Sequence, residues 1–185
     1  SVALMQGAQS WSKLRRPATD QRRASEAYVM QKTTVMDASQ LEDWLEKASI
    51  EHYTCDQCNG LHLPRLQELE GVVDSRLFVE SWGILLSTEF VIRPTAMLVV
   101  AADSGRLNMD YPTLKLFLDV VDDAMPQLVT GATLLTGAGV TPEQFRLFIS
   151  STVDAVTQVG AELAHLDYLL PEEGSEPPAR QSHVH

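Results

Sequence analysis

Both cysteines of this 185-residue chain lie in one short segment, Cys55-Asp-Gln-Cys58, and His62 follows closely behind. Two thiolates at this spacing are typical of a zinc knuckle, and an imidazole is a common further ligand. The same thiols could form a reversible disulfide or act as a redox pair. A third interpretation is structural, because Asn59 and Gly60 favour a β-turn in which the cysteines only pack.

A complete metal site is not evident from the sequence. A structural zinc ion needs four ligands, and His52 is the nearest candidate for a fourth. The remaining histidines are His165 and two in the C-terminal tail, and no second Cys-x2-Cys or His-x3-His pair is present. No metal and no cofactor is therefore predicted.

A redox pair of the thioredoxin type is matched only in part. Such a pair lies at the N-terminus of a helix, whose dipole lowers the pKa of the first thiol. Here a turn and Pro64 follow the pair, and Asp56 between the thiols opposes thiolate formation. The sequence therefore favours a packing role at a turn, and it leaves Cys55, Cys58 and His62 as an alternative redox or metal-binding set.

A short helix and two short strands are predicted around this motif. Ser39 and Glu42 form a capping box that starts a helix over residues 39–48. Residues 50–55 and 60–64 are predicted as strands that flank the turn. The apolar face of the predicted helix consists of Leu41, Trp44, Leu45 and Ala48.

Residues 73–92 are predicted as a β-hairpin that turns at Trp82 and Gly83. Its residues alternate between a polar side, which includes Asp74 and Arg76, and a drier side. The drier side consists of Ser75, Leu77, Val79, Ile84, Leu86, Thr88, Phe90 and Ile92.

The second half of the chain is predicted to contain further strands and two helices. Residues 95–102 are predicted as a strand, and Pro112 is predicted to begin a helix that ends before Pro126. Residues 127–136 are predicted as a strand pair or one bent strand. The last helix is predicted to start at Thr141 with a second capping box and to span about 27 residues. This order predicts an α+β fold built on an antiparallel sheet.

Two other groups of residues resemble functional sites only weakly. Gly137 and Gly139 lie between a predicted strand and a helix, but the segment lacks the lysine and the third glycine of a phosphate-binding loop. Asp119, Asp122 and Asp123 could hold a cation or a proton. Their position on a predicted amphipathic helix favours a solvated face, and no catalytic residue is predicted.

Composition and charge exclude several classes of function. The chain is 44% hydrophobic and 21% charged, with a net charge of -11, and no apolar run approaches the length of a membrane span. The charge divides unevenly, at +4 over residues 1–35 and -15 over the rest. The negative charge of residues 36–185 repels the phosphate backbones of nucleic acids, which argues against direct binding of nucleic acid. No export signal is evident, which predicts a cytoplasmic protein with reduced thiols.

Three regions are predicted along the chain. Residues 1–35 are predicted to be a basic, disordered extension, and Met30 or Met36 could be the natural start. Residues 36–170 are predicted to form a single α+β domain. Residues 171–185, rich in Pro and acidic side chains, are predicted to be a disordered tail.

Several segments of the predicted domain resemble the YbjN family of bacterial proteins. The segments, in order, are LEDWLEKASIEHYTCDQCNGLHLP, EGVVDSRLFVE, VIRPTAMLVVAAD, LKLFLDVVDDAMPQLV and GVTPEQFRLFI. The resemblance implies a sandwich like that of type III secretion chaperones, in which about three helices pack on a curved antiparallel sheet. The implied order of elements is α-β-β-β-α-β-β-α.

The resemblance also implies a non-enzymatic regulatory or chaperone-like role. Family members affect motility, exopolysaccharide production and stress responses, so the resemblance implies a regulator in sensory transduction. We expect such a protein to act by binding a protein partner, and a homodimer is conceivable because chaperones of this fold bind their targets around a dimer. The alternative is a thiol redox sensor or metal-binding protein that uses Cys55 and Cys58.

Overall fold

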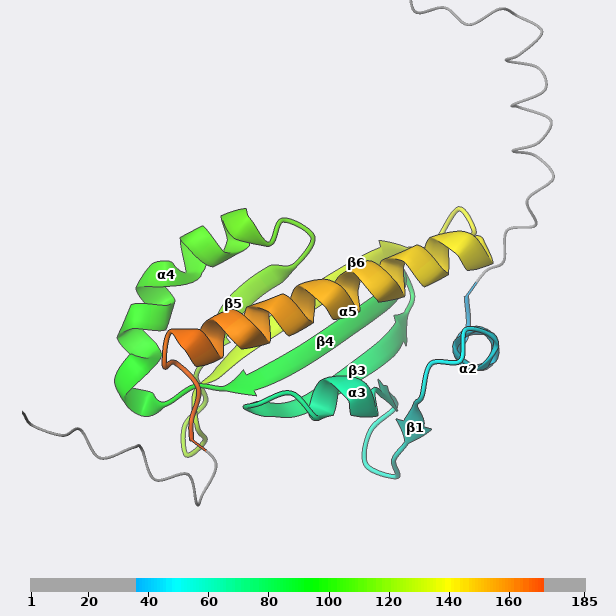
Figure 1. Ribbon diagram of the computed structural model, residues 1–185. Coiled ribbons are helices and arrows are strands. Elements are labelled where there is room, and N and C mark those ends of the chain that lie inside the picture. Colours follow the sequence, from blue (N-terminus) through cyan, green and yellow to red (C-terminus); the bar gives the residue numbers. More distant parts are fainter. Residues whose placement is uncertain (1–35, 172–185) are drawn as a thin grey trace, which may run out of the picture. The chain divides into compact units, whose positions relative to one another are not determined.

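A six-stranded antiparallel sheet organises residues 36–171, the part of the chain that the computed structural model describes (Figure 1). The spatial order of the strands is β1-β2-β3-β4-β6-β5. The strands are β1 (Tyr53–Thr54), β2 (Leu61–His62), β3 (Val72–Glu80), β4 (Gly83–Val91), β5 (Lys115–Asp119) and β6 (Gln127–Leu135). The α-helices of the described part are α2 (Ala38–Lys47), α3 (Pro64–Gln67), α4 (Met97–Asp110) and α5 (Pro142–His165). The predicted α+β class and antiparallel sheet are therefore confirmed.

The hairpin of β3 and β4 lies at the centre of the sheet, as the alternation of its residues predicts. Ser75 pairs with Thr88, and their buried hydroxyl oxygens lie 2.8 Å apart, so both polar groups are satisfied inside the core. Gly83 begins β4 at a φ of 155°, and a Cβ there would lie 2.1 Å from the carbonyl oxygen of Leu134. Only glycine allows β6 to approach this closely.

Helix α5 covers the drier face of the sheet, and Figure 1 shows it in yellow to orange running across the strands. Thr141 and Gln144 form the predicted capping box at its start. Gly160 lies against Phe90, where an added Cβ would be 3.1 Å from the ring. The buried residues of α5 are Phe145, Ile149, Thr152, Val156, Val159, Gly160 and Leu163. The helix is 24 residues long and ends at His165, slightly earlier than predicted.

Helix α2 begins with a different N-cap than predicted. The side chain of Asp37, not Ser39, accepts a hydrogen bond from the backbone N–H of Gln40, so the Ser39 prediction is wrong. The carboxylate of Asp37 is the better acceptor for a free N–H, because it is charged. The predicted apolar face is correct, since Leu41, Trp44 and Leu45 are buried.

The prediction of a strand over residues 95–102 is wrong. Pro94 starts a 3-10 turn, η2 (Pro94–Ala96), which leads directly into helix α4. Val100 and Leu107 are the buried residues of α4, two helical turns apart, while Leu98 is 77% exposed. The run of Val and Leu residues indicated a strand, but the side chains that the core accepts follow a helical period.

The prediction of a helix that starts at Pro112 is also wrong. Residues 115–119 form strand β5, in which Leu116 is buried between the exposed Lys115 and Phe117. Pairing with β6 supplies the backbone partners that make the strand favourable. Helix α4 covers the outer edge of β5, because the Asn108 side chain donates to the carbonyl of Leu116 and accepts from its N–H.

The acidic residues after β5 do not lie on a helix, which corrects the sequence-based placement of this group. Asp119 ends β5, and Asp122 and Asp123 follow in an exposed turn where Asp123 has a φ of 66°. Residues 127–135 form the single strand β6, which confirms the alternative of one strand and not the strand pair.

Within residues 36–171, every helix is too short or too polar to span a bilayer. The predictions for residues 1–35 and for residues 172–185 lie outside the described residues.

Candidate functional site

A tight hairpin at the edge of the sheet brings the two cysteines to the histidine. Strands β1 and β2 pair antiparallel, with Tyr53 opposite His62 and Thr54 opposite Leu61. Cys55 follows β1 directly, and Cys58 lies in the turn that leads to β2. Two strands flank a turn as predicted, but each is two residues long, shorter than the predicted segments 50–55 and 60–64, and Pro64 begins helix α3. The turn places both cysteines beside His62 at the end of β2.

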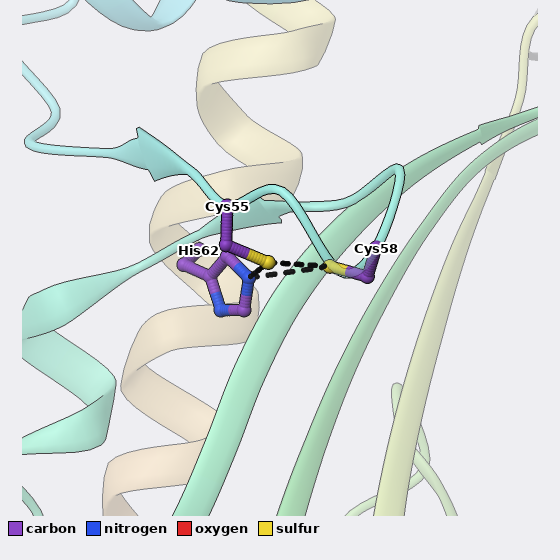
Figure 2. A group of neighbouring side chains, drawn as sticks. All are labelled: Cys55, Cys58 and His62. Atoms are coloured by element: carbon purple, nitrogen blue, oxygen red, sulfur yellow. Dashed lines mark hydrogen bonds between the residues drawn. The ribbon is translucent and has the colours of Figure 1, made fainter.

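The three side chains converge on one point (Figure 2). The sulfur atoms of Cys55 and Cys58 lie 3.4 Å apart, and each lies 3.2 Å from Nε2 of His62. Both cysteines are half-buried free thiols, whereas His62 is only 6% exposed. Within residues 36–171, these three residues form a group of potential metal ligands whose ligand atoms all lie within 4.8 Å of one another. We call them the Cys-Cys-His cluster.

The imidazole of His62 is held from two sides. Its Nδ1 lies 2.8 Å from Oδ1 of Asp74, and its ring stacks on Tyr53 at a centroid distance of 4.6 Å and an interplanar angle of 10°. Because an ionised carboxylate only accepts hydrogen bonds, we assign the proton to Nδ1. The lone pair of Nε2 then points toward the two sulfur atoms.

Asp74 is itself fixed by three neighbours. Its Oδ1 accepts hydrogen bonds from the Gln67 side chain and from the Ser75 N–H, both at 2.8 Å. Nε of Arg76 lies 3.2 Å from Oδ2, an ion pair that lacks the angle of a hydrogen bond. The Gln67 side chain also contacts the hydroxyl of Tyr53, so the ring stacked on His62 belongs to the same network.

These contacts shift the pKa values of the cluster. The Gln57 backbone N–H, the Cys58 thiol and, when its Nε2 is protonated, the His62 ring donate hydrogen bonds to the Cys55 thiolate and lower the pKa of Cys55 to about 7. Burial by itself would lower the pKa of His62, but hydrogen bonds with Cys55 and Asp74 outweigh it and raise that pKa. Burial would raise the pKa of Asp74, but its hydrogen bonds with His62 and Gln67 lower it.

The turn that carries Cys58 depends on a small residue. A Cβ at Gly60 would lie 2.9 Å from the ring of Phe78 and 3.2 Å from Cβ of Arg76. The turn therefore lies directly against strand β3, with the guanidinium of Arg76 over the ring of Phe78. This close approach keeps Cys58 within reach of His62.

The cluster can perform two kinds of chemistry. Two thiolates and an imidazole are ligands that zinc and other thiophilic metal ions prefer. Alternatively, the two thiols can become a disulfide, which needs the sulfur atoms to approach to about 2.05 Å. Packing alone would also bring Cys55 and Cys58 together, so their role stays a proposal.

Other residues considered from the sequence lie away from the cluster. His52 bonds through Nδ1 to the carbonyl of Ile50 at 3.0 Å and does not join the set of potential ligands. His165 ends helix α5. The short helix α3 does follow β2, but the cysteines precede the strand, so the arrangement is not that of thioredoxin.

Sequence reasoning placed Asp74 only on the polar side of a hairpin and did not name Gln67 or Tyr53. These residues are 12, 5 and 9 positions from His62, as the printed sequence shows. The alternation of the hairpin was the available signal, because it assigns Asp74 and Arg76 to one face. The pairing of β2 with β3 then brings His62 into contact with Asp74.

A groove lies near the same hairpin and has a volume of about 620 Å³. Its apolar lining comes from helices α3 and α5 and from the segments before β1 and after β2. Charged side chains of both signs also line it. The lining residues are Ala48, Ser49, Ile50, Glu51, Leu63, Arg65, Leu66, Glu68, Arg146, Ile149, Ser150, Val153 and Asp154.

A second polar group, which we call the Arg106 network, joins α4 to α5. The Arg106 guanidinium lies 2.6 Å from Asp103, 2.8 Å from Asp110 and 2.7 Å from Glu162. The hydroxyl of Tyr111 donates to Glu162 at 2.6 Å. One guanidinium thus contacts three carboxylates directly.

The fold and the site together define a small α+β protein with a six-stranded antiparallel sheet and a thiol–imidazole cluster on its edge hairpin. Residues 37–165 match the model of the YbjN family, described as "Putative bacterial sensory transduction regulator". The chain therefore belongs to the YbjN family, as its sequence resemblance implied. This description supports a regulatory role.

Similar proteins support the same assignment. YbjN of Escherichia coli strain K12 is 37% identical over 131 residues, which is 71% of this chain and 83% of that protein. YbjN of Shigella flexneri matches to the same extent. Both carry the name "Uncharacterized protein YbjN", which states no activity.

A solved structure shares the fold. The crystal structure of YbjN from E. coli, described as "a putative transcription regulator", superposes with a TM-score of 0.74 at 35% sequence identity. The match covers 76% of this chain and 100% of that chain. The similarity extends over the whole of that protein, so it includes the sheet and its helices.

Proposed function

We propose that this protein is a non-enzymatic regulator that senses a chemical signal at the Cys-Cys-His cluster and responds by binding another protein. The family description supports the regulatory class. Two adjacent thiols and an oriented imidazole are groups that respond to metal ions or to oxidants, as a sensor must. Oxidation by hydrogen peroxide would join the two sulfur atoms, and the two electrons and two protons lost by the thiols would reduce the peroxide to two water molecules.

The observation that carries this proposal is the position of strand β2. His62 belongs to the cluster, while its neighbours Leu61 and Leu63 are 5% and 2% exposed and belong to the core. Leu63 also lines the groove. A two-residue strand thus connects the cluster on one side to the groove on the other, and a shift of His62 would move Leu63.

The groove fits an amphipathic segment of a partner protein. Ile50, Leu63 and Val153 provide apolar surface, and Arg65 and Asp154 provide charges of opposite sign. An amphipathic helix binds such a groove through its apolar face and pairs its charges at the rim. The acidic charge of the body makes a protein a better partner than a nucleic acid.

The same proposal covers the cellular setting. A cytoplasmic location would keep the thiols of Cys55 and Cys58 reduced and ready to respond. Motility, exopolysaccharide production and stress responses, which the family resemblance implies, would be the processes affected. A homodimer is compatible with one groove in each subunit.

The proposal is tested by comparing variants of the full chain as bait in native cell extract. Val153→Lys puts a charge into the groove, and we expect it to abolish recovery of any partner that the unchanged protein retains. Leu147→Lys is the matched control, because Leu147 lies on the same helix at 67% exposure and does not line the groove. A partner that survives Val153→Lys would contradict binding in the groove.

A second arm tests the sensing step. The recovered partner is bound again by reduced, peroxide-treated and zinc-treated protein, beside a Cys55→Ser, Cys58→Ser double variant. We expect at least a tenfold change in affinity with one treatment and none in the double variant. Equal affinity under all three conditions would contradict a sensory role of the cluster.

A further inference from the structure

We propose that Cys55, Cys58 and His62 are three ligands of one zinc-class divalent metal ion, with a fourth coordination position left open. The inference deepens the proposed function, because it names the signal that the cluster would detect. It rests on the geometry of the ligand atoms, on the residues that orient His62 and on the exposure of the cysteines.

The spacing of the ligand atoms fits a single ion. In a tetrahedral zinc site the sulfur atoms are about 3.8 Å apart, and sulfur and nitrogen about 3.6 Å. The observed separations of 3.4 and 3.2 Å need to open by only a few tenths of an ångström. The circle through the three atoms has a radius of about 1.9 Å, so an ion at the usual bond lengths lies just outside their plane.

The donor types select the class of metal. Two thiolates and a neutral imidazole balance the charge of a divalent ion, and each thiol passes its proton to solvent when it binds. Sulfur and imidazole ligands favour zinc over magnesium or calcium, which prefer oxygen. A Cys-x2-Cys turn followed closely by a histidine supplies these donors from one hairpin.

Asp74 provides the second contact that metal-binding histidines require. A ligating histidine usually donates its other ring N–H to a carboxylate, which fixes the tautomer and the ring orientation. Here Nδ1 of His62 meets Asp74, and Gln67 holds the same carboxylate oxygen. Nε2 is thereby presented to the two sulfur atoms before any ion binds, so Asp74 is a positioning residue.

The open position makes the site suited to exchange. Structural zinc sites have four protein ligands, whereas sites with three protein ligands bind water or another group in the fourth position. The group of potential ligand atoms within residues 36–171 has three members, and Cys55 and Cys58 are half-buried at its outer side. A metal ion can therefore enter and leave without unfolding of the sheet.

The test uses the full chain, reduced and freed of metal, titrated with Co²⁺ as a spectroscopic substitute for Zn²⁺. We expect one ion per chain, intense visible bands of tetrahedral cobalt, and near-ultraviolet charge transfer from thiolate. Added Zn²⁺ should remove the spectrum and slow the alkylation of both thiols at least tenfold. Absence of both the spectrum and the protection in the unchanged protein would overturn the inference.

Variants assign the binding to the cluster. Cys55→Ser and Cys58→Ser should each weaken the affinity for Co²⁺ and at least halve the charge-transfer band, because one of the two thiolates is lost. Asp74→Asn should weaken the affinity by about 10- to 100-fold while keeping the tetrahedral bands. His52→Gln is the matched control and should bind as the unchanged protein does. Tight binding with an unaltered spectrum in the cysteine variants would overturn the inference.

The result also separates this inference from the proposed function. If neither Co²⁺ nor Zn²⁺ binds but peroxide treatment alters affinity for the partner, the metal inference fails and the sensing proposal survives. If the ion binds but partner affinity is the same with and without it, the metal site survives and sensing of this signal fails. Failure of both experiments would overturn both.

Discussion

The Cys-Cys-His cluster and the Arg106 network are both polar, and they differ in whether their groups satisfy one another. In the Arg106 network, the carboxylates of Asp103, Asp110 and Glu162 all contact one guanidinium. In the cluster, two thiols and the Nε2 of His62 face a common point without a charge between them.

This difference distinguishes a structural contact between two helices from a ligand-binding site. The ion pairs of Arg106 and the hydrogen bond from Tyr111 connect α4 to α5, and they already occupy the carboxylate oxygens that a ligand would contact. The cluster holds its donors in place through Asp74, Gln67 and Tyr53, which are not themselves among the converging atoms. Ligand atoms that neighbouring residues orient but do not neutralise are typical of a binding site.

Metal binding should change the free energy of unfolding more than any substitution in either region. Zn²⁺ at about 1,000 times its Kd should raise the free energy of unfolding by about 4 kcal/mol. The gain should disappear in Cys58→Ser and persist in Tyr111→Phe, which alters only the Arg106 network. Urea unfolding with and without Zn²⁺ measures both; an equal gain in Cys58→Ser would place the ion elsewhere.

The next effect concerns the turn that carries the cluster. Gly60→Ala should destabilise the protein by about 1–2 kcal/mol, because the new methyl group meets the ring of Phe78 at 2.9 Å. Gly105→Ala is the control near the Arg106 network, where nothing lies within 4 Å, and it should stabilise α4 by about 0.5–1 kcal/mol. Urea unfolding should give opposite signs, and equal signs would contradict the packing described for the turn.

A smaller effect is expected from the Arg106 network itself. Tyr111→Phe removes the hydroxyl that donates to Glu162 at 2.6 Å and should cost about 1 kcal/mol of stability. The Co²⁺ spectrum of this variant should not change, because α4 and α5 supply none of the three ligands of the cluster. A weakened spectrum would show that the two regions are coupled.

The smallest effect is a dependence on pH. Hydrogen bonds from Tyr111 and Arg106 lower the pKa of Glu162 below its usual value of 4.5. A lowered folded pKa contributes stability that is present above the unfolded pKa and is lost as the pH falls through the folded pKa. Glu162→Gln should therefore be less stable than the unchanged protein at pH 7, and the difference should shrink below about pH 4.5.

Thermal unfolding across that range measures the pH effect. Glu143→Gln is the control, because Glu143 is exposed at the start of the same helix and pairs only with Arg146. A difference that is constant from pH 7 to acid for Glu162→Gln would contradict the proposed charge coupling.

Sequence patterns predicted the elements whose local and tertiary preferences agree. The hairpin of β3 and β4 alternates cleanly, and α5 combines a capping box with a long apolar face. Between residues 93 and 126 the two preferences conflict. The spacing of Leu114, Phe117, Leu118 and Val121 matches a helix, yet pairing with β6 makes residues 115–119 a strand.

The sequence likewise predicted the part of the cluster that lies within one short segment, but not the residues that orient it. The Cys-x2-Cys turn and the alternation of His62 against Leu61 and Leu63 could be derived from local spacing. The partners of His62 could not, because Asp74 reaches it only through the pairing of β2 with β3. His52 was the nearest candidate for a fourth ligand in the sequence, and its position before β1 keeps it out of the cluster.

Short-range sequence patterns specify the α+β class, the central hairpin, the last helix and the turn that holds both thiols, because each depends on residues close together in the chain. Tertiary structure alone decided that α4 is a helix and β5 a strand, and that Asp74 orients His62 toward Cys55 and Cys58. These outcomes depend on strand pairing and burial between distant segments, which no local pattern contains.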